Sequence, residues 1–239
     1  MAAVGAIAAA PTAGMALAAE QTNVAPVFPQ LLKKGDTVAL VAPGTNVTDP
    51  DDLKKAFEAM EYFGLKPKTY RAAAEFGYKN RSVRTRTAEI HSAFSDSEVR
   101  AIVCLRGGYA SAMLLDSLDY GLILKNPKVF VGYSDITALH CAINKLSGLV
   151  TFHGPVALSS FTKYTIDFFE QVLFLGARPL KLSNPAPSES LRQPHPTRTI
   201  SAGVARGRIV GGNLSIICSL MGTPYEIDTK GNILIIEDV

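Results

Sequence analysis

The stretch 128-KVFVGYSDITALH-140 leaves a short apolar strand through a glycine and places Ser134 and Asp135 at the start of an expected helix. Two roles are open for Ser134. A strand, Gly132, one residue, serine and then a helix form the outline of a nucleophile elbow, although the second glycine of that motif is missing and Asp135 follows the serine. Serine and aspartate are also favoured N-cap residues, so the same spacing fits a plain helix cap.

Apolar strands and helical segments alternate on both sides of this stretch. Strands are expected within 37–44, 65–71, 99–108 and 149–155. Helices are expected within 49–64, 135–148 and 166–176, and two more helices are expected to begin at Ser82 and near Ser111. Continuous apolar strands that alternate with helices are typical of a parallel sheet covered on both faces. The sequence therefore predicts an α/β fold with a mostly parallel sheet, whose site lies at the carboxyl ends of the strands.

Composition divides the chain into four segments. Residues 1–27 are predicted to be a signal or leader segment, 28–177 an N-terminal α/β domain, 178–200 a linker, and 201–239 the start of a second α/β domain. Five prolines and little periodicity mark the linker. The last segment offers one helix and two short strands, which is too little for a stable domain. We therefore expect the second domain to be cut short at Val239.

The N-terminal segment has some features of an exported protein. It is alanine-rich and carries a small-x-small site around Ala16 to Ala18, as a cleavage region would. It lacks a positively charged n-region, so a disordered or mis-called N-terminus is the alternative. Pro11 and Gly14 interrupt the apolar stretch, and no other segment reaches the roughly 20 residues of a spanning helix. We expect an exported, periplasmic protein without a membrane span, with a cytoplasmic location as the alternative.

Charge and motif content argue against several classes of function. The sequence has 24 basic and 21 acidic residues, which gives a net charge of +3, and no basic block is interleaved with aromatic residues. A nucleic-acid partner is therefore not expected. Metal-ligand spacings and nucleotide-binding motifs are also missing from the sequence, so we expect neither a metal nor a cofactor. Cys104, Cys141 and Cys218 lie in apolar sequence without C-x-x-C spacing and are expected to be buried free thiols.

Two further strand exits carry groups suited to catalysis. Gly107 and Gly108 let the backbone approach a ligand, and their N–H groups suit half of an oxyanion hole; an ordinary turn is the alternative. Glu237 ends a run of four aliphatic residues and either pairs with a histidine or is a solvated strand end. His140 lies more than a turn beyond the serine on another helical face. His153 follows a strand and is the internal candidate for a base.

Six motifs, taken together, resemble the LD-carboxypeptidase family of serine peptidases in order and spacing. They are VALVAPG, IVCLRGGYAS, KVFVGYSDITALH, TFHGP, GRIVGGNLSIICSLMGTPYE and NILIIEDV, and the resemblance covers roughly residues 33–239. It implies Ser134 as nucleophile, Glu237 as the group that orients a histidine, and an oxyanion site built from the amides of Gly107 or Gly108 and of Asp135. The implied activity is release of terminal D-alanine from murein tetrapeptides by acyl transfer, with peptidyl-nucleotide toxins as a variant substrate.

The sequence departs from the family pattern at its end. In the family the histidine lies some tens of residues beyond the glutamate, whereas two residues follow Glu237 here. The resemblance therefore implies a truncated chain that is inactive as given, because loss of a triad base costs several orders of magnitude in rate. Arg106 is the candidate for binding the substrate carboxylate, with a solvated arginine as the alternative. A homodimer is expected from similar proteins, and a non-catalytic α/β peptide-binding protein is the alternative function.

Overall fold

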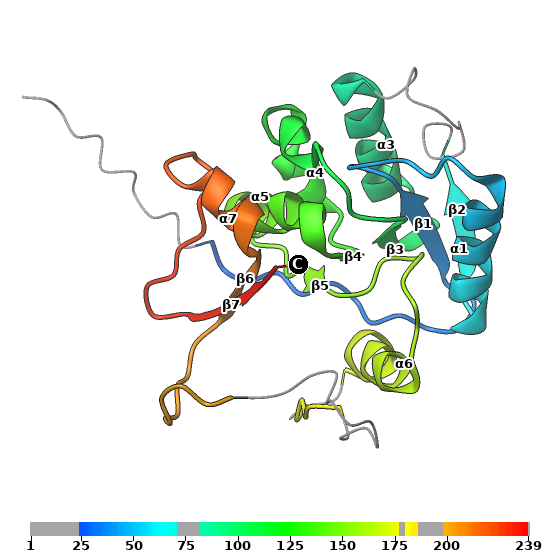
Figure 1. The fold of residues 1–239 in the computed structure, drawn as a ribbon. Coiled ribbons are helices and arrows are strands. Elements are labelled where there is room, and N and C mark those ends of the chain that lie inside the picture. Colours follow the sequence, from blue (N-terminus) through cyan, green and yellow to red (C-terminus); the bar gives the residue numbers. More distant parts are fainter. Residues whose placement is uncertain (1–23, 71–81, 177–179, 186–197, 239) are drawn as a thin grey trace, which may run out of the picture.

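A computed structural model describes residues 24–70, 82–176, 180–185 and 198–238 of the protein. Its centre is a parallel sheet (Figure 1). The strand order is β2-β1-β3-β4-β5, and every neighbouring pair is parallel. The strands are β1 (Thr37–Val41), β2 (Lys66–Thr69), β3 (Val99–Cys104), β4 (Val129–Gly132) and β5 (Phe152–His153). The predicted fold class is therefore confirmed. The strand order reverses between β1 and β3, which is where ligand crevices form in such sheets.

Helices cover both faces of this sheet, as predicted (Figure 1). One face carries α3 (Val83–Ser95), α4 (Tyr120–Lys125) and α5 (Thr137–Ser147), and the other carries α1 (Pro50–Tyr62) and α6 (Lys163–Glu170). Successive residues of a strand point to opposite faces, so the sheet contributes to two apolar cores. Ile102 of β3 packs with Phe94 and Leu139 in one core, whereas its neighbour Val103 packs with Met60 in the other.

The helix expected from Ser111 onward is two short elements instead. Ser111–Ser117 forms a 3-10 helix, η2, and α4 begins only at Tyr120. Asp119 separates the two, because its Oδ1 accepts the N–H of Leu122 at 2.8 Å and caps α4. The helix expected over 166–176 is also divided, since α6 continues after its last residue as a π-helix, η4 (Gln171–Leu175).

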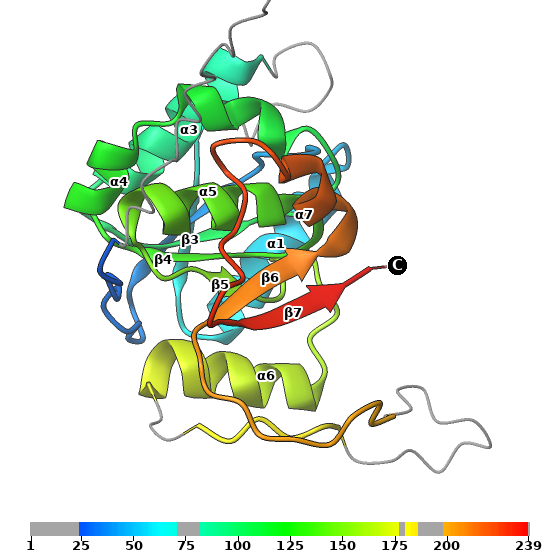
Figure 2. The same cartoon turned by 90° about the vertical axis from the view of Figure 1, so that its left-hand side faces the viewer.

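The C-terminal residues form a second, two-stranded parallel sheet. Its elements are β6 (Ile209–Asn213), α7 (Leu214–Leu220) and β7 (Ile233–Glu237). Figure 2 shows this sheet beside β5 and α5. Leu220 joins the core beneath α5, and Nζ of Lys145 on α5 donates to the Glu226 carbonyl at 2.8 Å. Residues 209–238 therefore pack against the α5 side of the main sheet.

Part of the predicted leader belongs to the folded unit. The N–H of Val27 donates to the Gly148 carbonyl at 2.8 Å, and Val27 pairs with Leu149 in a parallel bridge. Residues 1–23, which include the predicted cleavage region, lie outside the described residues. The predicted linker is described only at 180–185 and 198–200, which contain no helix or strand.

The cysteines differ in their surroundings. All three are free, and Cys104 and Cys141 are buried as predicted, but Cys218 is exposed. The reason lies in α7, which contacts the core through Ile216 and Leu220 and leaves its opposite side to solvent. Across the described ranges, none of the helices combines the length and the apolar character that a bilayer crossing needs.

Candidate active site

Ser134 follows β4 in a backbone conformation that is rare for a residue with a side chain. Its φ is 60°, and it begins the 3-10 helix η3 (Ser134–Ile136), after which α5 starts at Thr137. The N-cap residues of the two helices are Tyr133 and Ile136, and neither makes a side-chain capping bond. The capping interpretation of Ser134 is therefore wrong. A left-handed conformation costs a non-glycine residue about 1–2 kcal/mol, and strain of this kind clusters at functional sites.

Two glycines make room for this serine. A Cβ on Gly132 would lie 2.7 Å from Cγ2 of Ile136, so the turn after β4 closes only without a side chain there. A Cβ on Gly107 would lie 3.1 Å from Cβ and 3.4 Å from Oγ of Ser134. The structure therefore brings the glycine turn after β3 directly beside the serine. Arg106 precedes this turn and is half-buried.

Gly108 adopts a backbone that favours glycine. Its φ is 108°, and a Cβ there would lie 2.1 Å from Oγ1 of Thr45 in the turn after β1. The N–H of Thr45 also donates to the Gly107 carbonyl at 3.1 Å. The turns after β1 and β3 are thus packed against each other, backbone to backbone, at the carboxyl edge of the sheet.

Asp135 has a buried side chain with a structural contact that was not predicted. Its Oδ2 accepts the N–H of Ser111 at 3.0 Å, and its carbonyl accepts the Ser111 hydroxyl at 2.5 Å. Burial raises the pKa of the Asp135 carboxyl, although the Ser111 hydrogen bonds and the charge of Arg86 act in the opposite direction. Ser111 and Asp135 are 24 positions apart in the sequence, and no local pattern signals this pairing.

Glu237 reaches the same edge from the second sheet. Its Oε1 lies 3.7 Å from Nε2 of His153, and this oxygen is buried without a hydrogen-bond partner. His153 pairs in register with Gly132, which precedes the serine by two positions. Burial lowers the pKa of His153, and the negative charge of Glu237 partly offsets that effect. The structure therefore places Glu237 beside His153, on the strand that pairs with β4 just before Ser134.

The neighbouring acid has a different partner. Oδ2 of Asp238 accepts from the N–H of Ser215 at 3.2 Å and from its hydroxyl at 2.8 Å, at the start of α7. Asn213 also contributes here, because its Oδ1 accepts the N–H of Ile216 at 3.1 Å and its own N–H donates to Oγ1 of Thr137 at 3.0 Å. The Asn213 bond to Thr137 fastens the end of β6 to the start of α5, one turn after the serine.

His140 supports the strand before the serine. Its Nε2 donates to the Gly132 carbonyl at 2.9 Å, and the ring packs edge-on against Phe130. Burial lowers the pKa of His140 to about 4, so the ring is neutral near pH 7. The bond to the Gly132 carbonyl ties the His140 ring to the backbone at the end of β4.

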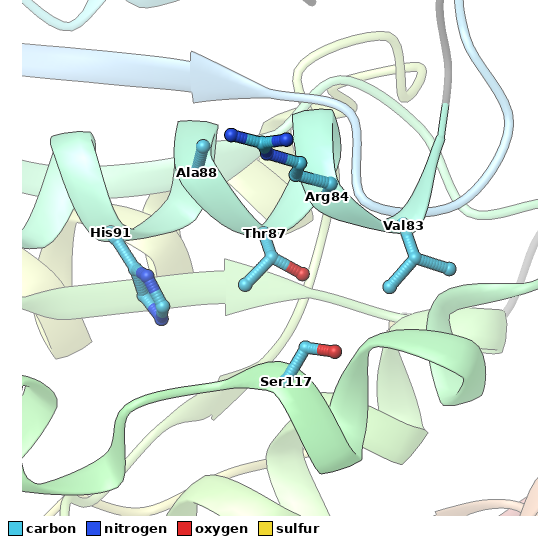
Figure 3. A pocket seen from close by; sticks show the side chains of 6 residues that line it. All are labelled: Val83, Arg84, Thr87, Ala88, His91 and Ser117. Carbon is cyan, nitrogen blue, oxygen red and sulfur yellow. The ribbon is translucent and has the colours of Figure 1, made fainter.

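A pocket elsewhere on the molecule lies between α3 and η2 (Figure 3). The side chains that line it are Val83, Arg84, Thr87, Ala88, His91 and Ser117. No residue of the predicted site is among them. In the described part of the chain, no three histidine, cysteine, aspartate or glutamate side chains are placed to hold a metal ion.

Comparison with known proteins identifies the family of this chain. Residues 38–154 match the LD-carboxypeptidase N-terminal domain, and residues 206–239 match the LD-carboxypeptidase C-terminal domain. A "Probable murein peptide carboxypeptidase" of Bacillus subtilis is 38% identical over 88% of this chain. The chain belongs to the LD-carboxypeptidase family.

This LD-carboxypeptidase chain spans 65% of the length of the Bacillus subtilis relative. A "Murein tetrapeptide carboxypeptidase" of Pseudomonas aeruginosa is 30% identical over 84% of the chain and 66% of its own length. Among solved structures, an MccF-like protein from Bacillus anthracis superimposes with a TM-score of 0.75 at 33% identity, covering 89% of this chain and 70% of its own. The fold and the family are therefore shown by both sequence and structure.

The structure also brings three residues that sequence reasoning missed close to the candidate site. They are Arg86, Ser111 and Thr137, which are all buried. Arg86 and Ser111 bond to the turns around Ser134, whereas Thr137 accepts the N–H of Asn213 at the end of β6. Each makes its contact with a residue at least 24 positions away. Local patterns of residues cannot indicate such pairs.

Proposed function

We propose that the protein is a serine peptidase that releases terminal D-alanine from murein tetrapeptides, with Ser134 as the nucleophile. The observation that carries the proposal is the conformation of Ser134, which is left-handed, caps no helix and contacts Gly107 at the carboxyl edge of the sheet. A serine held in strain, whose hydroxyl makes no hydrogen bond to the described residues, is suited to attack a substrate. The names of the Bacillus subtilis and Pseudomonas aeruginosa relatives support murein peptides as the substrate class.

The proposed reaction is acyl transfer in two steps. Oγ of Ser134 attacks the carbonyl carbon of the L,D-amide bond and passes its proton to a histidine, which then protonates the leaving amine of D-alanine. Water hydrolyses the resulting ester and restores the serine. Amides of Gly107 or Gly108 and of Asp135 bind the oxyanion, because preorganised N–H donors stabilise the charge that develops on the carbonyl oxygen. Arg106 binds the carboxylate of the substrate.

Glu237 is proposed to orient the histidine. In the described chain the imidazole beside Glu237 is that of His153, whose Nε2 faces the carboxylate. Its Nδ1 lies against Gly212, where a Cβ would be 3.2 Å away. The proposed base is therefore either His153 itself or a histidine at the position that follows the glutamate in the family.

The test uses the protein translated from its complete reading frame. Purified protein is incubated with murein tetrapeptide, and D-alanine is quantified for the wild type, for Ser134→Ala and for Ser97→Ala, which alters a serine on an exposed turn. We expect activity in the wild type and in Ser97→Ala, and a loss of several orders of magnitude in Ser134→Ala. Equal activity in both variants would refute the nucleophile assignment.

Three further measurements extend the test. A wild type that binds the tetrapeptide without releasing D-alanine is a binding protein rather than a peptidase. His153→Gln distinguishes the two possible bases, because it leaves activity largely intact only if another histidine accepts the serine proton. A peptidyl-nucleotide substrate, assayed in parallel, separates cell-wall peptide cleavage from toxin cleavage.

A further inference from the structure

Three backbone turns meet beside Ser134, each after a different strand of the main sheet. They are residues 42–45 after β1, 106–111 after β3 and 133–136 after β4. Each is short, and two contain non-glycine residues with positive φ, Ala110 at 77° and Ser134 at 60°. Backbone in this region returns to a relaxed conformation unless surrounding groups hold it. Side chains around these turns must therefore hold them in place.

Asp135 links all three turns from within the third. Its Oδ2 and its carbonyl oxygen both accept hydrogen bonds from Ser111, at 3.0 Å and 2.5 Å. The same Oδ2 faces the first turn, where a Cβ on Gly44 would lie 2.5 Å from it. Asp135 is 3% exposed and Ser111 is fully buried, so water cannot replace these bonds.

Arg86 links the first two turns from α3. Its Nη1 donates to the Pro43 carbonyl at 2.6 Å and to the Ala110 carbonyl at 2.9 Å. The second bond holds the residue whose φ is 77°. Arg86 is 5% exposed, and its positive charge and the negative charge of Asp135 interact within the same buried region. A buried cation and a buried anion of this kind stabilise each other, and removal of either leaves the other uncompensated.

We infer that Arg86 and Asp135 are positioning residues, whose side chains hold the amides of the 107–111 turn against Ser134. Both side chains are buried behind the turns and act through the backbone. The inference rests on the proposed function, because a rigid turn matters to the rate only if its amides bind an oxyanion. Displacement of reacting or stabilising groups by about 1 Å costs about 100-fold in rate. We call Arg86 and Asp135 together the clamp, and we expect it to control kcat.

The first test measures the turn without relying on activity. Hydrogen exchange followed by mass spectrometry is compared for the wild type, Arg86→Gln, Asp135→Asn and the control Arg84→Gln, which alters an exposed arginine on the same helix. We expect amides 107–111 to exchange at least about tenfold faster in the first two variants and at the wild-type rate in the control. Unchanged exchange in both variants overturns the inference.

The second test measures catalysis in the same proteins. The expected result is a kcat for D-alanine release that is at least about tenfold lower in Arg86→Gln and Asp135→Asn, with KM within about twofold of the wild type. Arg86→Lys, which keeps the charge and one donor group, is expected to recover part of kcat. A loss of activity no larger than the loss of folded protein overturns the positioning role.

The two proposals fail in different ways. A wild type without peptidase activity whose variants still loosen the turn removes the proposed function and keeps the clamp. An active wild type whose variants exchange normally removes the clamp and keeps the function. If Arg86→Gln and Asp135→Asn do not fold, both measurements are made on Ser111→Ala and Arg86→Lys. Ser111→Ala is a milder change, because it deletes only the hydrogen bond from the Ser111 hydroxyl to the Asp135 carbonyl.

Discussion

Gly107 lies against Ser134 so closely that a Cβ at position 107 would be 3.1 Å from Cβ and 3.4 Å from Oγ of the serine. The same Cβ would be 3.3 Å from the Tyr133 carbonyl oxygen. Contacts this short require a neighbour to move by a few tenths of an ångström. The turn after β3 and the serine after β4 therefore share one boundary, and the position of each depends on the other.

Gly107→Ala is expected to displace Ser134 and to lower kcat for D-alanine release by at least about tenfold, because misplaced reacting groups lose rate steeply. Gly203→Ala is the matched control, since a Cβ there has no atom within 4 Å. Thermal unfolding of both variants shows how much of the loss comes from stability. A Gly107→Ala protein with wild-type kcat would contradict the contact.

Ser134→Gly is expected to be more stable than Ser134→Ala, by up to about 1 kcal/mol. Glycine relieves the left-handed strain, which costs the folded protein about 1–2 kcal/mol. Its greater freedom in the unfolded chain lowers the free energy of unfolding by about 0.4–1 kcal/mol and so offsets part of that gain. Both variants lack the nucleophile, so neither should release D-alanine. Urea denaturation measures the difference, and equal midpoints for the two proteins would argue against strain at this position.

His140 is expected to make the fold sensitive to acid. Burial lowers its pKa from 6.5 to about 4, so between these values the unfolded chain binds a proton that the folded protein excludes. The free energy of unfolding therefore decreases as the pH falls through this window, by about 3 kcal/mol in total. His140→Gln keeps a donor for the Gly132 carbonyl and does not titrate. Its stability, measured by denaturation from pH 7 to pH 4, should fall less than that of the wild type.

Glu237→Gln is expected to lower the pKa of His153 further. The carboxylate stabilises the imidazolium form at a separation of 3.7 Å, and the amide cannot. NMR titration of the His153 ring measures the shift. Asp238→Asn is the control, because Asp238 contacts Ser215 at the start of α7 instead. Equal shifts in the two variants would mean that Glu237 does not act on His153 directly.

The strands and their exits could be predicted because each is a local pattern. Runs such as 101–105 are continuously apolar, and β3 contributes to both cores in the structure, with Ile102 and Val103 on different faces. Helix starts were less predictable. The leucines after Ser111 were expected to lie in one helix, whereas the structure has a 3-10 helix there and a separate helix α4 that the Asp119 side chain caps.

The backbone conformation of Ser134 could not be predicted from its neighbours in sequence. Serine before a helix is a favoured cap, and the spacing around it fits both interpretations. The difference lies in a backbone angle held by contacts from other elements, including Gly107 after β3 and Asp135 with its partner Ser111. Those partners are separated by tens of residues, so no window of sequence contains them together.

Glu237 and Asp238 show the same division between local pattern and tertiary contact. Adjacent acids at the end of an apolar strand were expected to meet the carboxyl edge of a sheet, and the order of residues along the chain was enough for that. Their separate partners, His153 and Ser215, follow from the packing of β6 and β7 beside β5. Side-chain burial and hydrogen bonding depend on three-dimensional neighbours, and these exist only after the chain has folded.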